Sequence, residues 1–323
     1  MIAASMLDLV GSTPLVRIRG AWLEATPPAP RASRGRAAVW AKMENLNPGG
    51  SVKDRIAVAI VDDAERRGVL RTGATLIEAT AGNTGIGLAL VAAVRGYKLV
   101  CVLPEKMSVD KRLALAAVGA EVVVSPNAPP DSPDNFQNVA LRLARENGWF
   151  LTDQFNSEAN VRVHEETTGP EILEQAGASL GAFVAGVGTG GTLTGVGRFL
   201  KRSAPSALIV MADPLGSGLA EWVRSGVVGA DAPYLMEGIG SSKPPKILDR
   251  GIIDQVETVT DDEGFEMARR LQREEGLLVG GSAGTAVVAA FRVAASGRVR
   301  GPVVALLPDS WDRYFSKPWM RAS

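Results

Sequence analysis

Short apolar runs alternate along the chain with longer stretches in which apolar residues recur at helical spacing. The run 98–103 is almost wholly apolar, as expected for a strand buried on both faces, whereas 84–95 has the period of a helix. This pattern predicts strands at 39–44, 75–78, 98–103, 121–124, 149–152, 182–185, 208–212, 255–259 and 303–307. It predicts helices at 53–67, 84–95, 108–118, 133–147, 158–175, 261–274 and 282–295, and another that follows a glycine-rich loop and ends at 202.

The alternation of strands and helices predicts an α/β fold. Strands separated by helices of about a dozen residues favour open, twisted, mostly parallel sheets with helices on both faces. The sequence has no fixed-period repeat. We expect two α/β lobes with a cleft between them, because ligands in such folds bind beyond the carboxyl ends of the strands. Residues 7–18 are predicted to form a short helix, a turn and a strand, and 25–36, rich in Pro, Ala and Arg, a surface loop.

Composition narrows the class of protein. The 323 residues are enough for two lobes with cores, and 46% hydrophobic with 22% charged residues is ordinary for a globular protein. Thirty-five basic and 35 acidic residues cancel, which argues against nucleic acid or an anionic membrane as a partner. No signal peptide or apolar run of membrane-spanning length is present, so we expect a cytoplasmic protein.

Cysteine and histidine are too scarce for several kinds of site. The single cysteine, Cys101, excludes a disulfide within the chain and is expected to be a small buried residue. The single histidine, His164, leaves too few partners for a zinc site or a Ser-His-Asp triad, so no metal site is expected. We interpret His164 as a polar structural residue.

The loop 47–55 places a lysine in an unusual setting. Its sequence is Asn-Pro-Gly-Gly-Ser-Val-Lys-Asp-Arg, in which Pro48 and two glycines interrupt regular structure and Ser51 can cap a helix beginning near Val52. Lys53 then lies in the first turn, where the positive end of the helix disfavours a cation. This setting favours the neutral amine that a Schiff base with an aldehyde cofactor requires. Taken alone, Lys53 is better explained as an exposed first-turn lysine.

Three further loops follow predicted strands or open predicted helices. The loop 78–85 (Glu-Ala-Thr-Ala-Gly-Asn-Thr-Gly) offers backbone N–H groups and two threonines at a helix N-terminus, which suits a carboxylate. The loop 186–192 (Gly-Val-Gly-Thr-Gly-Gly-Thr) has the same position and suits a phosphate. The loop 280–284 (Gly-Gly-Ser-Ala-Gly) begins a late helix.

The glycine loop also permits a second interpretation. Gly186, Gly188 and Gly191 have the G-x-G-x-x-G spacing after a strand, and the next strand ends at Asp213, where a dinucleotide-binding fold places its ribose-binding acid. Read alone, the motif predicts a nicotinamide-dependent dehydrogenase or simple tight packing of helix on strand. However, it lies in the middle of the chain and leaves the other three loops unexplained. A phosphate-bearing aldehyde cofactor explains all four loops.

The four loops together resemble those of a known family. The segments 47–55, 80–85, 188–192 and 307–310 (Leu-Pro-Asp-Ser) resemble the pyridoxal-phosphate β-family of fold type II, the tryptophan synthase β-like fold. Within it the chain is similar to cysteine synthases (O-acetylserine sulfhydrylases) and to the catalytic core of cystathionine β-synthases. Segments 104–108, 237–240 and 276–284 favour the latter, and 167–172 is shared with the former. The resemblance covers nearly the whole chain.

The resemblance implies a cofactor, pyridoxal 5′-phosphate, in the cleft between the lobes. Lys53 would hold it as an internal aldimine and then remove the α-proton of the substrate. Asn83 would hydrogen-bond its ring hydroxyl, and Ser282 would face its pyridine nitrogen, leaving that nitrogen unprotonated. The phosphate would lie in a cradle formed by Gly188, Thr189, Gly190, Gly191 and Thr192. The amino-acid substrate would be bound by Thr80, Ala81, Gly82, Thr84, Gln154 and Gly238.

The implied reaction is β-replacement on an activated L-serine, most simply O-acetyl-L-serine, through an aminoacrylate. Sulfide as nucleophile would give L-cysteine, and homocysteine would give cystathionine. Three alternatives stay open. One is a non-sulfur nucleophile, as in enzymes that form O-ureidoserine or diaminopropionate. Another is a serine or threonine dehydratase, and the last is the nicotinamide-dependent dehydrogenase.

The resemblance also implies an organisation. Residues 46–152 would form a smaller, mobile N-terminal lobe that closes over the amino acid, and 1–45 with 153–323 the larger, cofactor-binding lobe. A homodimer is expected, with a small amino acid and a small nucleophile as substrates. Two residues depart from the usual pattern. Many relatives have serine where this chain has Ala81, which predicts a changed preference for leaving group or nucleophile, and Trp311 is an unusual bulk near the expected pyridine edge.

Overall fold

The computed structural model describes residues 2–20, 37–80, 82–105, 107, 109–129 and 131–321. The predicted surface loop at 25–36, the substrate residue Ala81 and the predicted start of a helix at Ser108 lie outside the described residues. The chain divides into two compact units, the first formed by Met1–Gly11 and Leu46–Val163 and the second by Ser12–Asn45 and His164–Ser323. Residues 1–11 and 153–163, which the sequence analysis assigned to the larger lobe, belong to the first unit.

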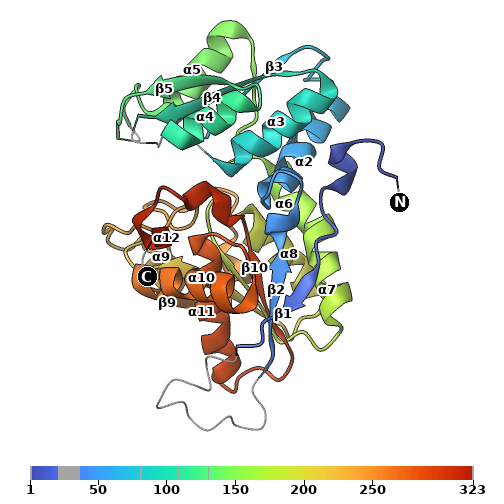
Figure 1. Cartoon of the computed structure of the whole chain (residues 1–323), viewed down its shortest axis with the longest axis vertical. Helices are drawn as coiled ribbons and strands as arrows, with labels where there is room; N and C mark the ends of the chain where they lie inside the picture. Colours follow the sequence, from blue (N-terminus) through green and yellow to red (C-terminus); the bar gives the residue numbers. More distant parts are fainter. Residues whose placement is uncertain are drawn as a thin grey trace. The chain divides into compact units, whose positions relative to one another are not determined.

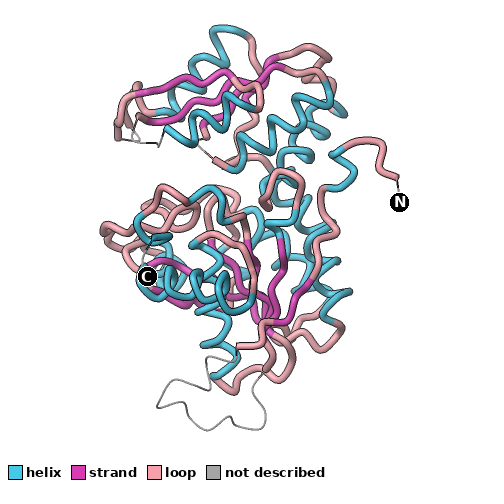
Figure 2. The backbone as a smooth tube through the Cα atoms, in the orientation of Figure 1, coloured by secondary structure: helices cyan, strands magenta, loops and turns pink. Residues whose placement is uncertain are grey.

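The first unit is built on a four-stranded parallel sheet in the order β5-β4-β3-β6 (Figures 1 and 2). Apolar side chains on both faces of the sheet explain why its inner strands read as continuous apolar runs. Helices α2 and α3 pack on one face, and α5 packs on the other. The elements of this unit are η1 (Met6–Leu9), α2 (Lys53–Arg66), β3 (Thr75–Ala79), α3 (Asn83–Arg95), β4 (Lys98–Pro104), α4 (Val109–Ala117), β5 (Glu121–Ser125), α5 (Phe136–Asn147), β6 (Phe150–Leu151) and α6 (Glu158–Val163).

The second unit is built on a six-stranded sheet in the order β1-β2-β10-β7-β8-β9, in which β1 alone is antiparallel to its neighbour. Helices α10 and α11 cover one face, and α7, α8 and α9 cover the other. Its strands are β1 (Leu15–Arg17), β2 (Val39–Met43), β7 (Ala182–Gly186), β8 (Leu208–Pro214), β9 (Gln255–Val259) and β10 (Val303–Leu307). Its helices are η3 (His164–Thr168), α7 (Gly169–Ala176), α8 (Gly191–Ser203), α9 (Leu219–Ser225), η4 (Arg250–Ile252), α10 (Asp261–Glu275), α11 (Gly281–Ala295), η5 (Trp311–Tyr314) and α12 (Pro318–Arg321), and η2 (Glu44–Leu46) follows β2.

Each sheet contains a point at which the chain reverses its direction of travel. In the first unit the chain runs from β3 outward to β4 and β5, and then returns to place β6 on the other side of β3. In the second it runs from β7 to β8 and β9, and then returns to place β10 on the other side of β7. Open α/β sheets bind ligands at such reversal points, beyond the carboxyl ends of the strands.

The observed elements differ locally from those expected. The predicted helix at 158–175 is divided, because α6 is followed by a π-helical turn, η3, before α7 begins at Gly169. Helix α2 begins at Lys53 with Val52 at the cap position, whereas the sequence analysis placed Ser51 there. The hydroxyl of Ser51 nevertheless accepts the Lys53 backbone N–H at 3.2 Å. Helix α9 was not predicted.

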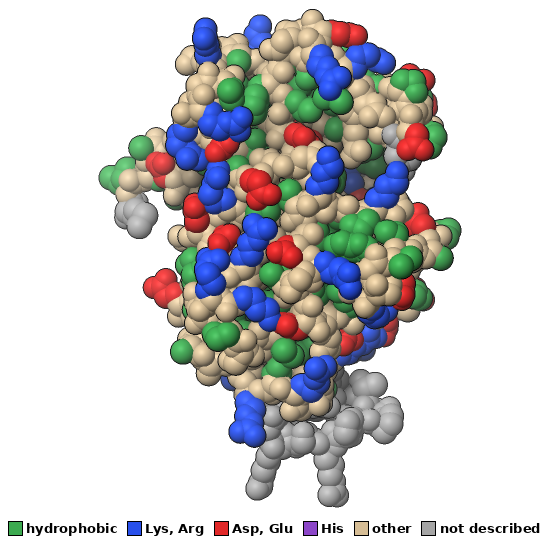
Figure 3. Space-filling model, turned by 180° about the vertical axis from the view of Figure 1, so that it is seen from behind, with side chains coloured by type: hydrophobic (Ala, Val, Ile, Leu, Met, Phe, Trp, Pro, Cys, Tyr) green, Lys and Arg blue, Asp and Glu red, His purple; other side chains and the backbone are tan. Residues whose placement is uncertain are grey.

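The surface carries charges of both signs. On the face drawn in Figure 3, Lys and Arg side chains lie interspersed with Asp and Glu side chains among the described residues. Within the described part of the chain, the helices are too short or too polar to cross a bilayer.

Candidate functional site

The loop before α2 is closed by a carboxylate of that helix. A turn at Asn47–Gly50 is held by the Gly50 N–H, which donates to the Asn47 carbonyl at 2.7 Å, and Gly50 has a φ of +77°, which suits glycine. The Gly49 N–H donates to the buried Asp54 carboxylate at 2.5 Å. A side chain at Gly49 would collide with that carboxylate. The sequence therefore folds this loop so that Lys53 is the first residue of α2.

Helix α3 packs closely against the start of α2. A Cβ at Gly87 would lie 3.0 Å from the Lys53 carbonyl oxygen, so only glycine at this position allows the two helices to approach as they do. The two helices belong to the same core cluster. Lys53 and the loop before α3 are thus parts of one rigid unit.

The N-terminus of α3 has the properties of an anion site. Its cap residue, Gly82, makes no side-chain capping bond, so the first N–H groups of the helix have no side-chain acceptor at the cap. The Thr80 N–H pairs with the Val102 carbonyl at 2.9 Å, and the Thr80 hydroxyl accepts the Gly82 N–H at 3.3 Å. Asn83 is the first residue of the helix. This arrangement agrees with the predicted carboxylate-binding loop.

The first turn of α3 and the loop after β6 meet through side chains at the reversal point of the first sheet. The Thr84 hydroxyl donates to Gln154 Oε1 at 2.6 Å, and both side chains are buried. Gln154 Nε2 faces Glu78 Oε1 at 3.4 Å. The Gln154 amide therefore has a fixed orientation, with its oxygen on Thr84 and one of its two N–H groups toward Glu78.

Glu78 is a buried carboxylate directly behind Gln154. Its Oε2 accepts the Thr152 hydroxyl at 2.5 Å and the Gln154 backbone N–H at 3.2 Å. Burial, with a smaller contribution from the nearby Asp153 charge, raises the pKa of Glu78 to about 7, because the three hydrogen bonds from neutral donors do not offset the lost hydration. Glu78 was not among the site residues predicted from the sequence. The signal for it was a charged residue inside an otherwise apolar strand.

The glycine loop of the second unit lies after β7, at the reversal point of that sheet. Helix α8 begins at Gly191 after Gly190, whose φ is +92°, and no side chain caps its first turn. A Cβ at Gly190 would lie 2.8 Å from the Leu248 side chain, and one at Gly188 would collide with the Gly238 carbonyl oxygen. The loop thus presents backbone N–H groups at the positive end of a helix, a cradle that fits a phosphate.

Two predicted neighbours of that loop are observed beside it. The segment that holds Gly238 runs along the loop, because the Gly240 N–H donates to the Val187 carbonyl at 2.9 Å. Thr192, in the first turn of α8, has its hydroxyl 3.1 Å from Nε2 of His164. His164 was interpreted as a structural residue, and its contact with the glycine loop was not foreseen.

Ser282 lies in the first turn of α11 and lines a small pocket. The other lining residues are Leu235, Met236, Glu237, Phe265, Gly281, Tyr314 and Trp319. The Tyr314 hydroxyl donates to the Asp309 carboxylate at 2.6 Å, and burial next to that carboxylate raises the Tyr314 pKa well above its usual value. The segment after β10 is fixed beside the start of α11 by the Gly280 N–H, which donates to the Asp309 carbonyl at 3.1 Å. Trp311 packs edge-on against Phe315, with the ring centroids 5.1 Å apart.

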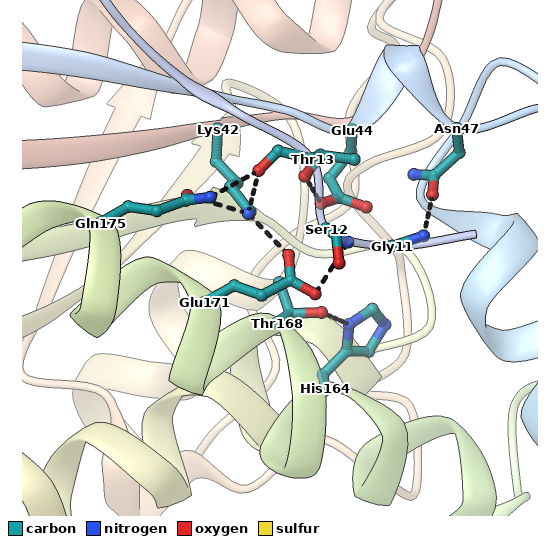
Figure 4. Close-up of polar contacts among 10 residues, drawn as sticks. All are labelled: Gly11, Ser12, Thr13, Lys42, Glu44, Asn47, His164, Thr168, Glu171 and Gln175. Carbon is teal, nitrogen blue, oxygen red and sulfur yellow. Dashed lines mark hydrogen bonds and ion pairs between the residues drawn. The ribbon is translucent and has the colours of Figure 1, made fainter. Parts of the chain in front are cut away.

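A buried lysine holds the start of the chain against α7 (Figure 4). Lys42 Nζ donates to the Thr13 carbonyl at 2.5 Å and to the Glu171 carboxylate at 2.7 Å, and its side chain is fully buried. Gln175 completes the group at 3.1 Å from the same ammonium. Within the described residues, no three His, Cys, Asp or Glu side chains are grouped so as to hold a metal ion.

Comparison with known sequences places the chain among pyridoxal-phosphate enzymes. A family profile described as "Pyridoxal-phosphate dependent enzyme" matches residues 6–309. A cysteine synthase of Staphylococcus aureus is 42% identical over 315 residues, which cover 97% of this chain and 96% of that protein. A cystathionine beta-synthase of Oryctolagus cuniculus is 45% identical over 322 residues, which cover 98% of this chain but 56% of that longer protein.

Comparison with solved structures also finds synthases named for serine derivatives. An O-ureido-L-serine synthase superimposes with a TM-score of 0.88 and 37% identity, covering 100% of this chain and 98% of the other. An O-acetylserine-dependent cystathionine beta-synthase from Helicobacter pylori superimposes with a TM-score of 0.85 and 36% identity, covering 98% of both chains. These likenesses confirm the predicted fold type II, with two parallel-rich sheets flanked by helices, and give no support to the nicotinamide alternative. The chain belongs to the family of pyridoxal-phosphate-dependent enzymes.

Proposed function

We propose that the protein catalyses β-replacement on O-acetyl-L-serine, exchanging the acetoxy group for a nucleophile. The observation that carries the proposal is the whole-length likeness to an O-acetylserine-dependent synthase, together with the fixed Thr84–Gln154 pair beside the uncapped N-terminus of α3. When bound, pyridoxal phosphate withdraws electrons from Cα of an amino acid, so that a substituent at Cβ can leave and be replaced.

The described residues fit the cofactor. The uncapped first turn of α8, with its positive φ at Gly190, offers N–H donors to a phosphate. Thr192 adds a hydroxyl from the same turn. Ser282 would offer a neutral hydroxyl to the pyridine nitrogen, and Asn83 would offer an amide to the ring hydroxyl. Lys53 would supply the primary amine that holds the cofactor, and the same amine could move the α-proton of the substrate.

The loop between β3 and α3 supports the substrate assignment. Thr80, Gly82 and Thr84 bracket the helix N-terminus, which stabilises an anion such as the α-carboxylate of the amino acid. Gln154 has one Nε2 hydrogen beyond the one directed to Glu78, and we assign it to the same carboxylate. Gly238, beside the glycine loop, completes the assigned substrate residues.

A second nucleophile class has a specific observation in its favour. The O-ureido-L-serine synthase matches this chain over its whole length with the higher of the two TM-scores given above. Replacement with hydroxyurea would form O-ureido-L-serine by attack of the hydroxyl oxygen on Cβ. We therefore propose sulfide, homocysteine and hydroxyurea as the nucleophiles to compare.

The test is an absorbance spectrum of the purified protein before and after addition of O-acetyl-L-serine. We expect a yellow protein whose band moves to longer wavelength with the donor and returns when a nucleophile is added. The rate of that return ranks the three nucleophiles. Release of keto acid without any nucleophile would instead identify a dehydratase. A colourless protein that does not take up pyridoxal phosphate would contradict the proposal.

Lys53→Ala tests the assigned lysine. We expect the variant to bind pyridoxal phosphate without a covalent link, so that denaturation releases the cofactor without prior hydrolysis and the response to O-acetyl-L-serine is lost. Lys98→Ala, at an exposed position in the same unit, is the matched control and should behave as the parent. An unchanged response in Lys53→Ala would remove the lysine from the site.

We further propose that the protein acts as a homodimer in the cytoplasm. Its lone cysteine, which suits a reducing compartment, supports the location. Light scattering after size-exclusion chromatography tests the assembly, and fractionation of the source cells tests the location.

A further inference from the structure

We propose that His164 is a positioning residue, which directs the hydroxyl hydrogen of Thr192 toward the cofactor phosphate. The inference rests on the proposed function, since it assigns the glycine loop to that phosphate. His164 is the only histidine of the chain. Its imidazole ring is fully buried and lies between two threonine hydroxyls.

The ring contacts both hydroxyls at hydrogen-bond distance. Nδ1 of His164 is 2.9 Å from Oγ1 of Thr168, as Figure 4 shows, and Nε2 is 3.1 Å from Oγ1 of Thr192. Thr168 is itself fully buried. Both contacts lie within the second unit: the contact with Thr168 is internal to η3, and the contact with Thr192 joins η3 to the first turn of α8.

Counting hydrogens fixes the direction of these bonds once a phosphate is present. A threonine hydroxyl has one hydrogen to donate, and a phosphate dianion has none, so it binds only donors. If Thr192 donates to the phosphate, its oxygen must accept from the ring, and Nε2 must carry a proton. In the neutral ring Nδ1 is then an acceptor, which Thr168 can satisfy. The opposite tautomer would draw the Thr192 hydrogen onto Nε2 and away from the phosphate.

The backbone explains why this histidine reaches the loop. The π-helical turn η3 interrupts the helical stretch between α6 and α7 at His164–Thr168, and such turns often occur at functional sites. Gly169 follows, and a Cβ there would lie 2.9 Å from the ring of Phe199 on α8. Glycine at this position lets η3 lie directly against α8. An uninterrupted helix would not space the residues of this turn in the same way.

The direct test is the protonation state of the ring in the holoenzyme. Because the chain has a single histidine, a ¹⁵N–¹H spectrum of protein labelled with [¹⁵N]histidine contains one imidazole. We expect a proton on Nε2, whether or not Nδ1 also carries one. A neutral ring with its proton on Nδ1 and none on Nε2 would overturn the inference.

Variants test the consequence for the cofactor. We expect His164→Ala to lose pyridoxal phosphate about tenfold more readily on dilution, as for one hydrogen bond to a charged group, and to shift the ³¹P resonance of the bound cofactor. His164→Gln, which retains an N–H near the position of Nε2, should restore both readouts in large part. Thr194→Val removes another buried hydroxyl of α8, one that pairs with the Ile247 carbonyl, and should leave the ³¹P resonance unchanged.

The outcomes separate this inference from the proposed function. A holoenzyme that responds to O-acetyl-L-serine but has a ³¹P resonance equally insensitive to His164→Ala and Thr194→Val would overturn the role of His164 alone. A wild-type protein that holds no pyridoxal phosphate would overturn the proposed function. If His164→Ala does not fold, the spectrum of the wild-type ring still decides the question.

Discussion

Thr84 Oγ1 donates a hydrogen bond of 2.6 Å to Gln154 Oε1, although 70 residues separate the two side chains in sequence. The bond joins the first turn of α3 to the loop after β6, which the return of the chain makes neighbours. It orients the Gln154 amide so that an N–H group faces away from Thr84. A side chain that can rotate is thereby converted into a fixed donor beside the N-terminus of α3.

Thr84→Val should therefore weaken substrate binding through Gln154, because the single hydroxyl hydrogen of Thr84 is donated to Gln154 Oε1. We expect KM for O-acetyl-L-serine to rise about tenfold or more, the effect of a lost bond to a charged group, while Thr84→Ser stays near the parent. Gln154→Ala should raise KM for O-acetyl-L-serine by about the same factor. The double variant should raise KM little more than either single variant does. Fully additive effects on KM would show that the two side chains act separately.

Glu78 should make stability fall as the pH rises. Its ordinary pKa is 4.5, and burial raises the folded-state value to about 7, so the folded protein holds a proton that the unfolded chain releases. Its contribution is therefore complete below about pH 4.5 and is lost as the pH rises toward 7, by on the order of 3 kcal/mol. Urea unfolding at several pH values should show this loss in the parent and a flatter profile in Glu78→Gln. Equal slopes in the two proteins would place the titration on another group.

Gly188→Ala should damage the cofactor site while sparing the rest of the fold. The added methyl group would collide with the Gly238 carbonyl oxygen, so the glycine loop or the facing segment must shift. We expect at least a tenfold loss of pyridoxal phosphate affinity. Gly251→Ala is the control, because its methyl group would meet only the Asp249 carboxylate, at 3.2 Å. Retention of the cofactor by Gly188→Ala at parental affinity would remove this loop from the site.

Lys42→Met should destabilise the second unit more than a double variant that removes both the Lys42 and the Glu171 charges. The single variant leaves the Glu171 carboxylate without its 2.7 Å ion pair, at a cost of about 3–5 kcal/mol in the free energy of unfolding. Lys42→Met combined with Glu171→Leu removes both charges and should recover part of that loss. Arg66→Ala, which breaks an exposed pair with Asp63, should change stability by under about 1 kcal/mol. A double variant less stable than Lys42→Met would contradict this account.

The local parts of the fold and site were predictable from the sequence. Proline and glycines before Lys53, and glycine loops after apolar runs, fix where strands end and helices begin, and these loops have the expected positions. What the sequence could not supply was the order of the strands. Thr84 and Gln154 were each predicted as substrate residues, yet nothing local shows that β6 pairs with β3.

His164 escaped prediction for a related reason. A π-helical turn depends on how the helix packs against its neighbour, and the pattern of apolar residues over 158–175 indicated an uninterrupted helix. The contact with Thr192 joins residues from two elements that only the folded sheet brings together. Glu78 could have been found, because a carboxylate inside an apolar strand requires nearby donors.

The single cysteine makes the protein suitable for measuring local opening by thiol labelling. Cys101 lies in the centre of β4 with no exposed surface, and burial raises the pKa of its thiol to about 12. The thiolate that reacts with disulfides is therefore scarce at neutral pH. A thiol substrate or product would find no partner in the folded chain for a mixed disulfide. The rate at which a thiol reagent labels the protein then measures one event, the opening of the sheet around β4.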